Sequence, residues 1–98
     1  MEGVKDRDAG VVYYVLDASR LDIRVKIGTT TNLSERLKSL AHQTMSRQQP
    51  LVLALEDGGE RREVERHQQF DRHRAMGEWF RYDKELMDHV ASLPHPVG

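Results

Sequence analysis

The segment Val11–Leu16 reads Val-Val-Tyr-Tyr-Val-Leu, an uninterrupted apolar run in a chain in which 32% of the residues are charged. Such a run predicts a strand with both faces largely covered, because β-branched and aromatic side chains favour extended backbone. After a polar connection, Ile23–Ile27 alternates apolar residues with Arg24 and Lys26, which predicts a half-buried strand. Together the two segments predict an antiparallel hairpin with a long loop, and Gly28 ends its second strand.

The chain then changes to helical periodicity. Asn32 and Glu35 resemble a capping box, and leucines at i, i+4 and i+7 from Leu33 predict a helix of about ten residues. Leu51–Leu55 is short and uncharged, which predicts a third strand in the centre of the sheet. A polar helix is expected over Glu60–Arg74.

The last third of the chain completes the predicted fold. Only Val64 and Phe70 are strongly apolar in the polar helix, so few side chains anchor it to the core. Gly77–Phe80 returns to an extended segment, and Asp83 is placed to cap a final helix. The element order predicts an α+β fold with a small antiparallel three-stranded sheet flanked by helices.

The length and amino-acid composition exclude several classes of protein. The 98 residues are predicted to form a single domain (1–98, core about 11–93). The absence of cysteine excludes disulfides, Cys-ligated zinc and a thiol nucleophile. No apolar run approaches the ~20 residues that span a bilayer, and no apolar signal segment is present at the N-terminus, so we expect a cytoplasmic protein. The net charge is -1, so any contact with nucleic acid has to come from local clusters of basic residues.

Four polar residues come from four different predicted elements. Tyr13 lies on the first strand and Lys26 on the second. Arg36 lies on the first helix and Glu63 on the next, with His67 one turn later. Phosphodiester hydrolysis needs a group that activates water, cations for the phosphate and a carboxylate for a metal ion. A phenol, an arginine with a lysine, and a glutamate meet these needs, so the set predicts a phosphate-cleaving site at the mouth of the sheet.

The order of the motifs resembles the GIY-YIG nuclease superfamily. It is most similar to a phage-type branch named after a coliphage open reading frame and a meiotically up-regulated yeast gene. That branch has a tyrosine strand, Lys-Ile-Gly-x-Thr, an arginine helix, Glu-x-x-x-His-x-x-Phe and Gly-Glu-Trp-Phe. This chain carries the corresponding residues in the same order, as Val12-Tyr13, Lys26–Thr30, Arg36, Glu63–Phe70 and Gly77–Phe80.

The resemblance implies a GIY-YIG-like fold and a DNA endonuclease that uses one Mg²⁺ or Mn²⁺ ion. It implies that Tyr13 activates or orients the attacking water, that Arg36 neutralises charge on the phosphate, and that Glu63 binds the metal. A lone carboxylate is a reasonable Mg²⁺ site because this ion keeps several waters and takes other ligands from phosphate. DNA contacts are expected from Lys26, Thr30, Arg36 and Lys38.

Two departures from the superfamily leave other functions open. Lys26 stands in place of the second tyrosine of the superfamily pattern, at the nucleophile side of the site, where we expect it to act as a base or as a phosphate-binding cation. The late asparagine of many members is absent, since the chain reads Glu78-Trp79 there. One alternative is therefore a non-catalytic DNA-binding module on the same fold. The near-zero net charge supports another, a small protein-interaction domain. A homodimer or a larger partner would supply sequence specificity.

Some of these residues compete for a role. Glu65 is a rival metal ligand in the same charge-rich segment, but Glu63 is preferred because it places His67 on its own helical face. His67 is expected to act through Glu63 or to be structural. Tyr14 is expected to face the opposite side of the sheet from Tyr13 and to be structural.

Overall fold

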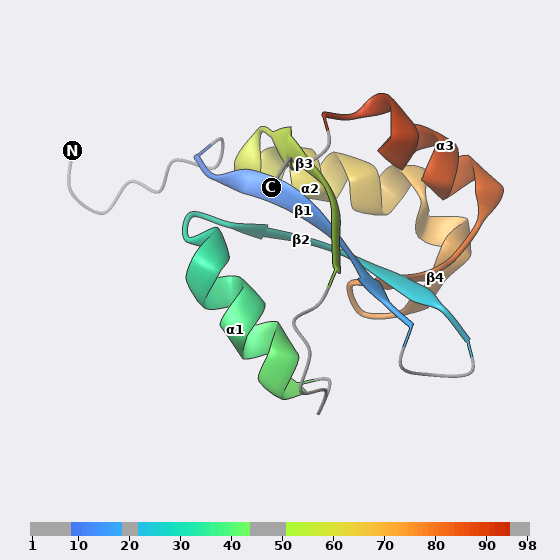
Figure 1. Cartoon of the computed structure of the whole chain (residues 1–98). Coiled ribbons are helices and arrows are strands. Elements are labelled where there is room, and N and C mark those ends of the chain that lie inside the picture. The colour runs from blue at the N-terminus through green and yellow to red at the C-terminus, as the bar shows by residue number, and fades with distance from the viewer. Residues whose placement is uncertain (1–8, 19–21, 44–50, 95–98) are drawn as a thin grey trace.

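The computed structural model describes residues 9–18, 22–43 and 51–94. Its elements, in chain order, are β1 (Val11–Asp17), β2 (Arg24–Thr30), α1 (Leu33–Gln43), β3 (Leu51–Asp57), α2 (Gly59–Gln69), a 3-10 turn (Asp71–His73), β4 (Arg74–Met76), β5 (Trp79–Arg81) and α3 (Lys84–Ser92). Figure 1 shows a twisted sheet with α1 on one face and with α2 and α3 on the other. The predicted α+β class is confirmed.

Within these described residues the sheet has five strands in the order β3-β1-β2-β5-β4, and each neighbouring pair is antiparallel. The prediction of three strands is wrong because β4 and β5 have three residues each, which is too short for a recognisable periodic pattern. The central position predicted for Leu51–Leu55 is also wrong, since β3 forms one edge and Leu51 is 59% exposed. The middle strand is β2, whose Lys26 is buried despite its charge.

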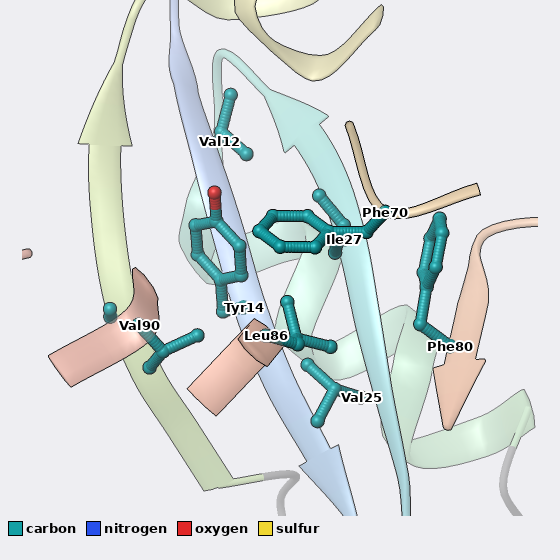
Figure 2. Close-up of a cluster of buried hydrophobic side chains, with 9 residues drawn as sticks. Val12, Tyr14, Val25, Ile27, Phe70, Phe80, Leu86 and Val90 are labelled. Atoms are coloured by element: carbon teal, nitrogen blue, oxygen red, sulfur yellow. The ribbon is translucent and has the colours of Figure 1, made fainter. Parts of the chain in front are cut away.

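Alternation along the strands produces one core on each face of the sheet. Tyr14 packs with Phe70 and Leu86 in the core beneath α2 and α3 (Figure 2). Tyr13 lies in the other core, where Leu40 of α1 covers it. The two adjacent tyrosines therefore face opposite sides of the sheet, as predicted, and neither ring has any exposed surface.

The predicted N-caps Asn32 and Asp83 are confirmed, but the reciprocal half of the capping box is wrong, because the Asn32 N–H donates to Thr30 Oγ1 and not to Glu35. Asn32 Oδ1 accepts a hydrogen bond from the backbone N–H of Glu35 at 3.2 Å. The Asp83 carboxylate accepts one from the N–H of Glu85 at 2.8 Å. Each bond satisfies a donor that the first helical turn leaves without a backbone partner. No helix within the described ranges is long and apolar enough to cross a membrane.

The helix predicted over Glu60–Arg74 is shorter than expected. Helix α2 ends at Gln69, Phe70 enters the core, and Arg74 begins β4. Phe70 is a buried anchor as predicted, whereas Val64 is 42% exposed. Burial of the Phe70 ring ends the helix because it outweighs the weak helical preference of the polar residues that follow.

A network of polar side chains connects β1 and β3 with α2 and α3. The Tyr14 hydroxyl donates to Glu56 Oε1 at 2.8 Å, and Arg66 donates to both carboxylate oxygens of Glu56, at 3.1 and 2.6 Å. His89 Nε2 lies 3.1 Å from the same hydroxyl. Burial by itself would raise the pKa of Glu56, but the hydrogen bonds from Arg66 and Tyr14 hold this pKa below its ordinary value of 4.5. The buried carboxylate is therefore charged at neutral pH.

Candidate functional site

The residues predicted to form the catalytic site lie close together beside the part of β2 that does not pair with β5. Strand β5 pairs with β2 only as far as Lys26. Beyond that point the Ile27 N–H donates to the Glu78 carbonyl at 3.0 Å, and the Ile27 carbonyl lies 2.8 Å from His67 Nε2. Helix α2 therefore takes the place of a strand beside β2 and brings its side chains to this edge.

Gly28 allows the Tyr13 ring to cross β2. The two residues are direct partners in the register between β1 and β2. A Cβ atom on Gly28 would lie 2.3 Å from the Tyr13 hydroxyl oxygen and 2.4 Å from its Cζ atom, closer than non-bonded atoms approach. Any side chain at this position would displace the phenol, which explains the glycine of the Lys-Ile-Gly motif.

The guanidinium of Arg36 reaches from α1 to the same phenol, with Nη1 3.4 Å from the Tyr13 hydroxyl. Burial raises the pKa of Tyr13 above 10.0, while the hydrogen bond and the charge of Arg36 oppose this rise. The phenol is therefore neutral at physiological pH. Because Arg36 donates to its oxygen, the phenol can still donate its own hydrogen to a ligand.

Glu63, His67 and Glu78 form a cluster at the same edge. One ligand atom from each lies within 4.8 Å of the others, and all three side chains are half-buried. Lys26 Nζ lies 3.4 Å from Glu78 Oε1 and 5.5 Å from the centre of the Trp79 ring. The charges of both glutamates also raise the pKa of the nearby phenol, so the phenol and the cluster share one environment.

Glu78 is the member of the cluster that sequence reasoning did not assign. It lies in the turn between β4 and β5, directly after Gly77, whose φ of 57° is in the left-handed region. In the comparison with the superfamily motifs, this position corresponds to the absent asparagine. The Gly-Glu-Trp-Phe motif instead puts a carboxylate there, and this was the signal that could have identified it.

Burial and the neighbouring carboxylates raise the pKa of Glu63. Burial, the charges of Glu78 and Glu60, and a hydrogen bond with Glu78 raise the pKa of Glu63 from 4.5 to about 7, and Lys26 opposes the rise. Two carboxylates and an imidazole are a donor set that divalent ions accept. Two ligands of one Mg²⁺ ion lie at most about 4 Å apart, so small side-chain rotations would bring these groups to ligand distances. The residues present therefore fit a divalent metal ion.

The raised pKa of Glu63 predicts a pH-dependent difference in stability between the wild type and Glu63→Gln. The raised pKa means that the native state holds a proton that the unfolded chain has lost, so this group destabilises the wild type as the pH rises from about 4.5 to 7. From about pH 5 to 8 the variant should gain about 1–2 kcal/mol over the wild type, less than the full shift because solvent screens the site. Urea unfolding in EDTA measures this gain, and a pH-independent difference would contradict it.

Three other residues singled out in the sequence lie apart from the cluster. Thr30 uses its hydroxyl to bind the backbone of the turn before α1. Lys38 forms a surface ion pair of 3.7 Å with the glutamate three residues before it. Because Lys38 is two positions after Arg36, it projects from a different face of α1. The rival ligand Glu65 is 55% exposed and pairs with Arg62 at 3.3 Å.

Residues 10–93 match the family model described as the T5orf172 domain. The chain belongs to the T5orf172 domain family. The matched range runs from the start of β1 to the end of α3, so every site residue of this T5orf172 domain lies within it. No curated protein and no solved structure gives a significant match.

Proposed function

We propose that this T5orf172 domain is a divalent-metal-dependent endonuclease of the GIY-YIG type that hydrolyses phosphodiester bonds in DNA. The proposal is supported above all by one observation: Tyr13, Lys26, Arg36 and Glu63, which belong to four different elements, share one edge of the sheet. Contacts connect them, from Arg36 to the phenol at 3.4 Å and from Lys26 to Glu78 at 3.4 Å. The charge of Lys26 also lowers the pKa of Glu63, which places Glu63 in the same environment as the other three residues.

In this proposal the phosphate lies against the cations of the site. Arg36 binds the non-bridging oxygens and stabilises the charge that develops on them. The neutral Tyr13 phenol donates a hydrogen bond that orients the attacking water. Lys26 either acts as the base for this water or binds the phosphate. A divalent ion held at Glu63, when bound, supplies Lewis-acid stabilisation of the same charge.

Plasmid nicking by the purified full chain tests the proposal. We expect nicked product with Mg²⁺ or Mn²⁺, none with excess EDTA, and loss of nicking in Glu63→Gln. Glu65→Gln is the matched control, because it removes an equal charge from the same helix outside the cluster. Equal nicking by the wild type and Glu63→Gln would overturn the proposal.

One observation favours a second candidate, a non-catalytic DNA-binding module on the same fold. Tyr13 has no exposed surface, whereas a catalytic phenol has to contact water or phosphate. A binding module would retain DNA in Glu63→Gln and in EDTA, and its affinity would fall with salt as phosphate contacts are screened. Gel-shift titration beside the nicking assay separates the two functions.

A further inference from the structure

We infer that Glu63, His67 and Glu78 together hold one divalent first-row transition ion before DNA binds, with Mn²⁺ bound more tightly than Mg²⁺. The inference rests on the proposed function for the use of a divalent ion, but it replaces a lone carboxylate with three protein ligands. Helix α2 supplies two of them one turn apart, and the turn before β5 supplies the third. Phosphate is then not needed to complete the site.

The hydrogen bond of His67 supports its role as a ligand. Its Nε2 lies 2.8 Å from the Ile27 carbonyl oxygen, which can only accept, so Nε2 carries the hydrogen. A neutral imidazole then has its lone pair on Nδ1, the nitrogen that can bind a metal. Contact with the Phe80 ring, 5.2 Å between centroids, also restrains the imidazole. Metal-binding histidines usually have this arrangement, in which a backbone carbonyl fixes the tautomer.

The donor types indicate which ion is preferred. Mg²⁺ takes oxygen ligands and gives up its waters reluctantly, so an imidazole contributes little to its binding. First-row transition ions accept imidazole and carboxylate in one site, and Mn²⁺ is the weakest binder among them. A preference for Mn²⁺ over Mg²⁺ is therefore a demanding test of an ion site that includes His67.

Lys26 competes with the ion for Glu78. Its ammonium lies 3.4 Å from the carboxylate, and it is buried with only 8% of its surface exposed. An ion that binds Glu78 replaces this partner and leaves the ammonium free at the edge where phosphate is proposed to bind. Removing the ammonium by Lys26→Met should therefore tighten Mn²⁺ binding, because an opposing positive charge is lost.

Calorimetric titration of the full chain without DNA tests the inference. We expect one Mn²⁺ ion per chain, bound about tenfold or more tightly than Mg²⁺. His67→Gln and Glu78→Gln should each weaken Mn²⁺ binding by about 10–100-fold, and Glu65→Gln should not change it. Mn²⁺ binding that is unchanged in His67→Gln, or equal affinity for the two ions in the wild type, would overturn the inference.

A second measurement needs no variant and remains valid if a substitution prevents folding. Mn²⁺ is paramagnetic, so the ion should broaden the ring resonances of His67 in the wild-type protein at substoichiometric concentration. The His42 ring, which is exposed in the last turn of α1, is the internal reference. Equal broadening of both rings would overturn the site at His67.

The two proposals fail in different ways. If His67→Gln and Glu78→Gln nick DNA and bind Mn²⁺ like the wild type while Glu63→Gln does neither, the three-ligand site is wrong and the nuclease remains. If Mn²⁺ binds through all three residues but no condition gives nicked DNA, the site is correct and the nuclease is wrong.

Discussion

Replacement of Arg36 by alanine is expected to slow the nicking of DNA by about 100- to 1000-fold, the usual loss when one preorganised donor to a developing charge is removed. Arg36 reaches the site from α1 and contacts the Tyr13 hydroxyl at 3.4 Å, so its guanidinium lies close to the proposed phosphate position. Single-turnover assays at saturating protein isolate the bond-breaking step from DNA binding. Arg36→Lys should retain part of the rate, since it keeps the charge but loses the two parallel donors.

Lys38→Ala is the matched control for Arg36. It also removes a positive charge from α1, but its side chain is 62% exposed on a different face. We expect at most a few-fold change, which affects DNA affinity and not the single-turnover rate. Equal slowing by Arg36→Ala and Lys38→Ala would show that general electrostatic attraction accounts for the role of Arg36.

Glu56→Ala is expected to lower the free energy of unfolding by about 3–5 kcal/mol, because it removes the anion of a buried hydrogen-bonded pair and leaves its partners unsatisfied. The Tyr14 hydroxyl and Arg66 both donate to this carboxylate, and only 8% of the side chain is exposed. A domain of this size is commonly stable by about 5–15 kcal/mol, so the loss is a large fraction of the total. Urea unfolding followed by circular dichroism measures it.

Two further variants show which interactions of Glu56 account for this loss of stability. Glu56→Gln should cost less, since an amide oxygen still accepts the hydrogen bond of Tyr14. Glu65→Ala should cost about 0–1 kcal/mol, because it breaks only an exposed pair with Arg62. If Glu56→Ala costs no more than Glu65→Ala, the network between α2 and α3 is not a stabilising element.

The strongest local patterns in the sequence were sufficient for much of the fold. Alternation along β1 and β2 placed Tyr13 and Tyr14 on opposite faces, and side-chain chemistry located the caps at Asn32 and Asp83. The absence of charge in Leu51–Leu55 did not identify the central strand, which is β2 and carries the buried Lys26. The charge of Lys26 is compensated by Glu78, a contact that only the tertiary structure creates.

In the candidate site, too, relations within one element could be predicted from the sequence, whereas long-range contacts could not. Helical spacing was enough to bring Glu63 and His67 to one face of α2, since this relation lies within a single element. Glu78 joins them through a turn between two three-residue strands, and neither strand could be recognised from its sequence. Long-range pairing of this kind depends on register, which local patterns do not define.

The ring of Tyr13 occupies the volume that a side chain at Gly28 would need. Substitutions at positions 13 and 28 should therefore depend on each other. We expect a larger residue at position 28 to require a smaller residue at position 13. In a library that varies Gly28 alone, most members would have a displaced Tyr13 ring. Paired randomisation of the two positions would sample sequences that single substitutions cannot reach.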